Sequence, residues 1–466
     1  MAIADPTNQQ AEDDFRFATG LQVDLVIADF SELDAAIRRL YGRALGQERS
    51  SLKEINQEEL ANLVDVGADE VDNIEDLSLD ESPVSRYINQ ILLDAVRKGA
   101  SDIHFEPYEE RYRVRLRCDG ILVEIQQPAS HLSRRLSARL KILAKLDIAE
   151  RRLPQDGRIK LRLNDELAID MRVSTLPTLW GEKIVLRLLD SSAANLDIDK
   201  LGYSDEQKAL YLNALKRPQG MILMTGPTGS GKTVSLYTGL RVLNTTERNI
   251  STAEDPVEIN LCGINQVQVM PKIGFGFAEA LRSFLRQDPD VVMVGEIRDL
   301  ETAEIAIKAS QTGHLVLSTL HTNSAAETVT RLAHMGIEPF NLASSLSLII
   351  AQRLARRLCN HCKEVDDSPD IFLRHSIPNS QTIYKANSQG CNECNECNQG
   401  YTGRVGIYEV MPFTDKLKTS LISQPNALAI EDLARREGMR TLQESGLDKL
   451  LEGTTSYQEL QRVLYL

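Results

Sequence analysis

The sequence predicts an α/β protein in which a smaller α+β domain precedes a larger α/β domain. Three observations lead to this fold class. A glycine-rich loop lies between an apolar, strand-like run and a helical pattern, a second apolar run ends in acidic residues, and short alternating segments precede both. With 466 residues, the chain is long enough for roughly three domains.

The glycine-rich loop is Gly226-Pro227-Thr228-Gly229-Ser230-Gly231-Lys232-Thr233, which has the form G-x-x-x-x-G-K-[ST]. It lies between the apolar run Met221–Thr225 and the leucine-spaced segment Val234–Leu243, so we expect it at a helix N-terminus, where anions are favoured. The glycines let backbone N–H groups point at phosphate oxygens. Lys232 can reach the β- and γ-phosphates, and the Thr233 hydroxyl can ligate Mg²⁺. The pattern predicts a nucleotide-binding loop made of all eight residues.

The net charge and the hydropathy pattern count against several classes of protein. A formal charge of −14 argues against a nucleic-acid motor, which needs a basic track. There is no apolar run of about 18 residues, so nothing in the sequence is expected to span a bilayer. Residues 1–20 are acidic and lack the apolar centre of a signal peptide. We therefore expect a cytosolic protein.

A small α+β domain is predicted between an acidic stretch and the glycine-rich loop. An amphipathic helix is expected from Pro83 to about Lys98. The other elements are strands at 112–116 and 121–125, a helix at 132–146, and strands at 158–163, 168–173 and 183–188. The predicted organisation is an N-terminal segment 1–48, an acidic linker 49–81, the α+β domain 82–190, a second linker 191–200 and the α/β domain 201–466.

Five of the seven cysteines are grouped near the C-terminus. Cys359-x-x-Cys362 forms one pair, and the second pair is either Cys391 with Cys394 or Cys394 with Cys397. In a cytosolic chain, paired C-x-x-C elements indicate a structural Zn²⁺ site in which four thiolates leave no position for substrate. We predict Cys359, Cys362, Cys394 and Cys397 as ligands, with Cys391 as the alternative to Cys397. The other interpretation is a cluster of free thiols.

Two acidic clusters follow strand-like runs beyond the loop. Asp290 and Glu296 bracket the run Val291–Val294, and Asn249–Ala253 precedes Glu254-Asp255-Pro256-Val257-Glu258. A carboxylate at the end of a strand beside the loop can approach Mg²⁺ and the γ-phosphate, or orient the attacking water. Each cluster alone also fits a solvated strand end, but their order around one phosphate loop makes that interpretation weaker.

Four motifs in order resemble those of the hexameric ATPases of the type II secretion and type IV pilus superfamily. They are the glycine-rich loop, Glu254–Glu258, Asp290–Asp299, and Thr312–Asn323, which contains His314 and His321. Outside this core, the resemblance extends to Ser101–Pro107, Pro154–Arg158, and the cysteines followed by Gly400–Arg404. It covers nearly the whole chain. It implies a RecA-like P-loop motor domain, a PAS-like fold for the smaller α+β domain, and an inserted zinc-binding element at 359–397.

The resemblance also implies roles for individual residues. Glu258 and Glu296 would activate water or support the metal, with the choice of base left open, and His321 would sense or position the γ-phosphate region. Arg282 and Arg286, expected at i and i+4 on one helix, would face the nucleotide or a neighbouring subunit. Without these roles, His314 and His321 would be hydrogen-bonded core residues, and each arginine would be an ordinary surface residue. From the smaller domain, Arg158 and Arg172 would reach the phosphates when the two domains close.

Finally, the resemblance implies an ATP hydrolase that forms a homohexamer and acts on an inner-membrane platform protein. Glu258–Leu261 and Gly406–Val410 look more like the type IV pilus extension ATPases than the type II secretion ATPases, which are the alternative. Residues 1–48 resemble a remnant of the family's N-terminal domain, through which other machine subunits would dock. Three further classes are a DNA translocase, a small-molecule kinase and a scaffold with a degenerate loop. The acidic net charge argues against a DNA translocase, and the lack of a lid pattern argues against a small-molecule kinase. The presence of Lys232 argues against a degenerate loop.

Overall fold

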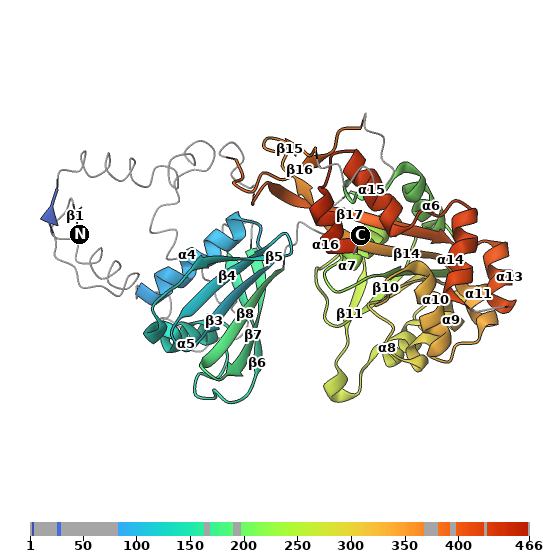
Figure 1. The fold of residues 1–466 in the computed structure, drawn as a ribbon. Helices are drawn as coiled ribbons and strands as arrows, with labels where there is room; N and C mark the ends of the chain where they lie inside the picture. The colour runs from blue at the N-terminus through green and yellow to red at the C-terminus, as the bar shows by residue number, and fades with distance from the viewer. Residues whose placement is uncertain are drawn as a thin grey trace. The chain divides into compact units, whose positions relative to one another are not determined.

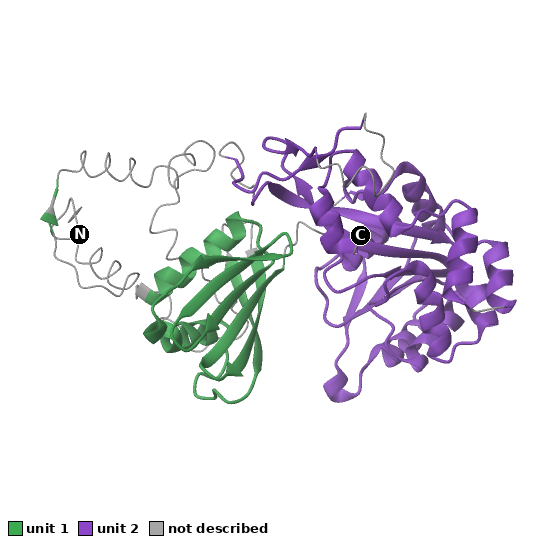
Figure 2. Cartoon of the chain, in the orientation of Figure 1, with its two compact units in different colours: residues 1–190 green, residues 191–466 purple. Residues whose placement is uncertain are grey.

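The computed structural model describes residues 2–3, 26–28, 83–162, 168–189, 197–367, 381–391, 398–423 and 426–464. The chain divides into two compact units, unit 1 with residues 1–190 and unit 2 with residues 191–466 (Figure 1 and Figure 2). The predicted α/β class is confirmed. Of the helices in these described ranges, none is long and apolar enough to cross a membrane.

Unit 1 is built on a six-stranded antiparallel sheet in the order β5-β4-β3-β8-β7-β6. Its strands are β3 (Asp102–Pro107), β4 (Tyr112–Cys118), β5 (Ile121–Gln126), β6 (Gln155–Arg162), β7 (Ala168–Thr178) and β8 (Gly181–Leu189). Its helices are α4 (Pro83–Arg97), η1 (Ser130–Leu132) and α5 (Ser133–Leu143), and near the N-terminus β1 (Ala2–Ile3) pairs with β2 (Val26–Ile27). The predicted helix at 132–146 stops at Leu143, because Lys145 has a positive φ of 56°.

Side-chain alternation gives this sheet one buried face and one polar face. Buried and half-buried residues alternate along β4, as a period of two requires. Phe105 and Val114 from the strands form one core cluster with Leu92 of α4 and Leu136 of α5. Fully burying each such side chain stabilises the fold by about 1.5–3 kcal/mol. The helices therefore cover one face of the sheet, which leaves the other face to charged residues.

Unit 2 contains a seven-stranded mixed sheet in the order β11-β10-β12-β13-β9-β14-β17. Neighbouring strands run parallel except at one edge, where β17 pairs antiparallel with β14. The strands are β9 (Gly220–Thr225), β10 (Ile250–Glu254), β11 (Asn265–Gln268), β12 (Val291–Val294), β13 (Leu315–Leu320), β14 (Leu346–Leu358) and β17 (Tyr401–Pro412). The short strands β15 (Glu364–Val365) and β16 (Tyr384–Lys385) form a separate pair.

Helices cover both faces of the unit 2 sheet. Met221 and Leu223 of β9 belong to one core cluster and Ile222 and Met224 to another, because consecutive strand residues point to opposite faces. One face packs against α6 (Asp205–Leu215) and α7 (Lys232–Leu243), with η3 (Ile198–Lys200) nearby. The other packs against α8 (Phe277–Phe284), α9 (Leu300–Gln311), α10 (Ala325–His334), α11 (Pro339–Ser345), α13 (Asp415–Ser423), α14 (Ala427–Arg436), α15 (Leu442–Leu451) and α16 (Tyr457–Leu464), while η4 (Pro271–Ile273) lies before α8.

The parallel order of the strands positions the candidate site. β9 lies between β13 and β14, and β12 lies on the far side of β13. Because parallel strands end at the same edge of a sheet, the segments after β9, β12 and β13 emerge together. The following helices are fixed by side-chain caps, since Asp299 accepts from the N–H of Thr302 (2.8 Å) and Ser324 from that of Glu327 (3.2 Å).

Candidate nucleotide site

The phosphate loop, residues 226–233, connects β9 to α7. All residues of β9 are buried, so the start of the loop is fixed within the sheet. Gly226 and Gly231 have φ angles of 147° and 84°, which residues with a Cβ rarely adopt. A Cβ on Gly226 would also lie 2.5 Å from the carbonyl oxygen of Gln352. The backbone path of the loop therefore requires glycine at both positions.

The interior of this loop offers polar groups that fit a phosphate. The hydroxyl of Ser230 is buried and has no hydrogen-bond partner in the described parts of the chain. Helix α7 begins at Lys232 without a side-chain cap, so its first N–H groups are not satisfied by a capping side chain. Anions bind readily to such a helix start. Elsewhere in the loop, the residues exposed to solvent are Pro227, Thr228, Gly229 and Thr233.

The side chain of Lys232 folds back against the loop. Its Nζ donates to the carbonyl oxygens of Gly226 (2.7 Å) and Pro227 (3.0 Å). Burial lowers the pKa of Lys232 to about 8; the charge of Arg353 lowers it further, while that of Glu296 raises it. An ammonium group that is mostly removed from water gains strongly from a phosphate partner.

Glu296 and His321 lie together at the ends of neighbouring strands. Glu296 follows β12 and His321 follows β13, and these strands are paired in parallel. Nε2 of His321 lies 3.4 Å from Oε2 of Glu296, while the guanidinium of Arg298 pairs with Oε1. Because the charge of Glu296 also acts on Lys232, the predicted carboxylate, histidine and phosphate-loop lysine share one edge of the sheet. No role of its own was predicted for Arg298, which lies within the motif Asp290–Asp299.

The first acidic cluster separates into a structural and a candidate functional carboxylate. Glu254 is buried and accepts hydrogen bonds from Thr252 Oγ1 (2.6 Å), Gln266 Nε2 (3.1 Å) and the Tyr237 hydroxyl. Glu258 is half-buried in the segment after β10. Burial and the Glu254 carboxylate raise the pKa of Tyr237, whereas the backbone of Glu258 lowers it. Glu258 therefore lies near α7, the helix that begins in the phosphate loop.

Arg282 and Arg286 do not share a helix. Helix α8 ends at Phe284, so Arg286 lies beyond it, and the expectation of an i, i+4 pair on one helix is wrong. Asp288 adopts a positive φ of 52° before Pro289, a context that disfavours helix. Instead, Nη1 of Arg286 donates to the carbonyl oxygen of Arg282 (2.8 Å) and so caps the helix end. Arg282 itself is exposed and pairs with Glu301.

Arg158 and Arg172 lie directly opposite one another on β6 and β7 in unit 1. Arg187 on β8 continues the row opposite Arg172, and Asp102 on β3 follows, with Oδ1 at 3.1 Å from Nε of Arg187. Like charges on directly opposed strand positions are destabilising, and the carboxylate of Asp102 offsets part of this repulsion at the Arg187 end of the row. Arg187 was not predicted, because its place in the row depends on strand register.

Arg353 of β14 is a further residue at the phosphate loop that the sequence did not indicate. Its Nη2 donates to the carbonyl oxygen (3.1 Å) and to Oδ1 (3.3 Å) of Asn323, two residues after His321. Thr225, at the end of β9, also reaches this segment, since its hydroxyl oxygen accepts from the N–H of Thr322 (2.9 Å). The phosphate loop is therefore tied to the segment that follows β13.

Three cysteines converge beyond the end of β14. The sulfurs of Cys359, Cys362 and Cys391 lie within 4.8 Å of one another, and those of Cys359 and Cys391 are 3.8 Å apart. Tetrahedral zinc with Zn–S bonds of about 2.3 Å places its sulfurs about 3.8 Å apart, so this set fits the metal. The other two predicted ligands, Cys394 and Cys397, lie outside the described residues. Cys391, the alternative ligand, belongs to the cluster.

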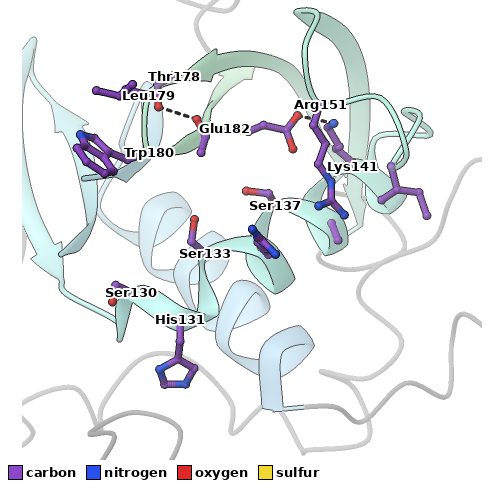
Figure 3. A pocket seen from close by; sticks show the side chains of 14 residues that line it. Ser130, His131, Ser133, Ser137, Lys141, Arg151, Thr178, Leu179, Trp180 and Glu182 are labelled. Atoms are coloured by element: carbon purple, nitrogen blue, oxygen red, sulfur yellow. Dashed lines mark hydrogen bonds and ion pairs between the residues drawn. The ribbon is translucent and has the colours of Figure 1, made fainter. Parts of the chain in front are cut away.

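A cavity of about 620 Å³ lies in unit 1 between α5 and the hairpin of β7 and β8 (Figure 3). Trp180 and Arg151 line it, and Lys141 and Glu182 form a buried ion pair in its wall. Nζ of Lys141 also donates to the carbonyl oxygen of Glu150 (2.6 Å). None of the predicted site residues lines this cavity, so we assign it no part in nucleotide binding.

Comparison with known families decides what kind of protein carries this site. The family model described as type II/IV secretion system protein matches residues 78–462. The chain belongs to this family. A second model, the MshEN domain, matches residues 1–47 of this secretion family member. The two matches together cover the described residues of both units almost completely.

Relatives within the secretion family are similar over almost the whole chain. The type IV pilus assembly ATPase PilB of Pseudomonas aeruginosa is 56% identical over 467 residues, covering 99% of this chain and 81% of that protein. PilB of Acinetobacter baylyi is 53% identical over 471 residues, with coverages of 99% and 80%. The type II secretion system protein E of Xanthomonas campestris pv. campestris is 45% identical over 462 residues, again with 99% and 80% covered.

Two solved structures at lower sequence identity share the fold. The ATPase DotB of Legionella pneumophila superposes with a TM-score of 0.60 at 21% identity, covering 81% of this chain and 95% of that one. The pilus retraction motor PilT with bound ADP superposes with a TM-score of 0.54 at 24% identity, covering 80% and 95%. At these identities the likeness shows the fold alone.

Proposed function

We propose that this protein is an ATP-hydrolysing motor that drives type IV pilus assembly. The observation that carries the proposal is the convergence of Lys232, Glu296 and His321 beside a phosphate loop whose buried Ser230 hydroxyl has no hydrogen-bond partner among the described residues. The similarity to PilB proteins supports pilus assembly as the process that consumes the ATP. Type II secretion is the alternative, supported by relatives at 45–49% identity.

Each predicted residue has a role in this proposal. Lys232 and the loop N–H groups hold the phosphates, and Thr233 with a carboxylate holds Mg²⁺, which neutralises charge on the phosphate oxygens. Glu296 or Glu258 orients and deprotonates the attacking water. His321 would donate a hydrogen bond to the γ-phosphate. Arg282 and Arg286 are exposed on unit 2, where they would contact the nucleotide or a neighbouring subunit of a homohexamer.

The arginine row of unit 1 supplies the mechanical step in this proposal. Arg158 and Arg172 on the polar face of the sheet would bind the phosphates while ATP is present and release them after hydrolysis. A ligand shifts such a domain equilibrium only by its different affinity for the two states, which the γ-phosphate provides. Coordinated around a ring, this opening and closing would move an inner-membrane platform protein that adds pilins to the fibre.

Three finer assignments belong to the same proposal. Unit 1 would be the PAS-like module of the motor, and the cysteine cluster would hold one structural Zn²⁺ with a fourth ligand from Cys394 or Cys397. Since a site of four thiolates leaves no open position, the metal would stabilise the region and take no part in hydrolysis. Residues 1–48 would dock to other subunits of the machine, which would keep the protein at the inner membrane.

The decisive experiment measures ATP hydrolysis by the purified chain in three mixtures. These contain the cytoplasmic part of a pilus platform protein, the equivalent part of a type II secretion platform protein, or single-stranded DNA. Stimulation by the pilus component alone is the expected result. Stimulation by the secretion component would favour the alternative function, and stimulation by DNA alone would show that the load of the motor is a nucleic acid.

A further inference from the structure

Arg353 occupies the junction between the phosphate loop and the segment that carries His321. It lies two residues after Ala351, which pairs with Thr225 at the end of β9. A Cβ built on Gly226 would lie 3.3 Å from Nη1 of Arg353, so the guanidinium borders the first residue of the loop. On its other side, Nη2 donates to both the backbone and the side chain of Asn323.

This arrangement uses properties that arginine has and lysine lacks. Guanidinium is planar and carries its donors in a fixed fork, so two partners held by one group are fixed relative to each other. Nη1 donates to the carbonyl oxygen of Gln352 (3.1 Å), which anchors the fork to β14 itself. The threonine contact between Thr225 and Thr322 joins the same two segments, with Oγ1 atoms 2.6 Å apart.

We propose that Arg353 is a positioning residue of the nucleotide site, which holds residues 321–323 against the phosphate loop and so sets the place of His321 beside the γ-phosphate. The proposal rests on the ATPase function proposed above and adds a residue that neither the motifs nor the relatives assign. Arg353 acts through His321, without itself being a catalytic residue.

Charged groups from several elements surround Arg353 and Lys232. The charged groups that face Lys232 are Glu296, from the segment after β12, and Arg353, from β14. On β17, Glu409 also lies within the field of Arg353. Replacing Arg353 by lysine keeps a positive charge at this junction and removes only the planar fork, so the lysine variant isolates the part that the guanidinium has in holding residues 321–323.

The test compares Arg353→Lys and Arg353→Gln in the full chain, each with and without His321→Ala. In the wild-type background both should lower kcat for ATP by roughly 10- to 100-fold, since small misplacements cost this much, while ADP binding at pH 7 is retained. In the His321→Ala background the same changes should add less than about twofold, because residues that act as a unit are not additive. Arg357→Gln, at an exposed position of the same strand, is the matched control and should be unchanged.

A split between kcat and nucleotide binding separates the positioning of His321 from a general loss of structure. In both variants kcat should fall while KM for ATP and the affinity for ADP stay within about threefold of the wild-type values, because the phosphate loop itself is unchanged. ADP binding and the melting temperature identify a variant that fails to fold, in which case the lysine variant carries the test. If both variants keep the wild-type kcat, the inference about Arg353 is overturned, while the proposed function stands. The same holds if the variants lose as much kcat in the His321→Ala background as they do in the wild-type background. Absence of hydrolysis by the wild-type chain overturns the proposed function as well.

Discussion

Oε2 of Glu296 and Nε2 of His321 lie 3.4 Å apart, although 25 positions separate the two residues in the sequence (321 − 296). The parallel pairing of β12 with β13 brings them together, because both residues follow the carboxyl ends of their strands. Arg298 holds the second oxygen of the same carboxylate. Glu296 is thus oriented from two sides and only partly exposed, as expected of a carboxylate that must accept a proton at a defined place.

Glu296→Gln should retain ATP binding and lose turnover by about 100-fold or more, since an amide of the same shape cannot accept the proton of water. Nucleotide titration and steady-state hydrolysis measure the two properties separately. Glu304→Gln, at an exposed position of α9, is the matched control. If the Glu296 variant hydrolyses ATP at the control rate and Glu258→Gln does not, Glu258 is the base.

Lys232→Ala should abolish detectable nucleotide binding, since it removes the buried cation beside the phosphates. The expected weakening is about 100-fold or more, given the strength of charge-assisted hydrogen bonds to phosphate. Lys272→Ala, which removes an exposed lysine of η4, should bind as the wild type does. The affinity of each protein for a fluorescent ADP analogue is measured by titration. Equal affinities of Lys232→Ala and the wild type would refute the assignment of residues 226–233 as the nucleotide-binding loop.

Nucleotide affinity should fall as the pH rises above about 8. The pKa of Lys232 in the unbound protein is lowered to about 8. Phosphate favours the charged form and so raises that pKa on binding. Below pH 8 the lysine is already charged; above it, binding must take up a proton, and affinity should fall by up to about tenfold per pH unit. Isothermal titration in buffers of different ionisation enthalpy would detect this proton uptake. Binding at pH 9 without proton uptake would contradict the prediction.

Cys359→Ser and Cys391→Ser should each release about one zinc per chain and destabilise the region after β14, because four-coordinate structural sites lose their metal when a ligand is removed. Elemental analysis and thermal unfolding provide the two measurements. Cys262→Ser, at an exposed cysteine outside the cluster, is the control. Retention of zinc by Cys391→Ser would show that Cys394 and Cys397 form the second pair without it.

Glu182→Ala should destabilise unit 1 by about 3–5 kcal/mol, because it leaves the fully buried Lys141 without its carboxylate. Lys141→Met combined with Glu182→Leu should recover most of this loss. Trp180 is the single tryptophan of the chain and lies beside the pair, so its fluorescence reports the unfolding of unit 1 selectively. Glu109→Ala is the exposed control, and an equal effect there would exclude a specific role for the ion pair.

Local features of the fold could be predicted from the sequence with little error. The apolar run 221–225 becomes β9, and the leucine-spaced segment becomes α7, which begins at Lys232. The period-two pattern at 112–116 becomes β4 (Tyr112–Cys118). These elements are dictated by periodicity and by glycine, both of which act over a few residues. The phosphate loop could be predicted for the same reason.

Features that depend on strand pairing could not be predicted in this way. Arg353 reaches the phosphate loop because β14 pairs with β9, and Arg187 joins Arg172 because of the register between β7 and β8. Neither residue lies in a local pattern with chemical meaning. The choice among the cysteines is similar, since several pairs satisfy one spacing and only the path of the chain brings Cys391 to Cys359.

The length of β14 has a mechanical consequence. This strand of 13 residues extends roughly 40 Å, at about 3.3 Å per residue. Arg353 at its middle borders the phosphate loop, and Cys359 follows its last residue directly. β17 pairs with β14 without interruption from Leu348 to Arg356, and the register shifts between Arg356 and Leu358, so the strand is held straight around Arg353 and can bend just before Cys359. A displacement of Arg353 is therefore carried along the paired part of β14 as far as Arg356, and the register shift there determines in which direction the cysteine cluster would move.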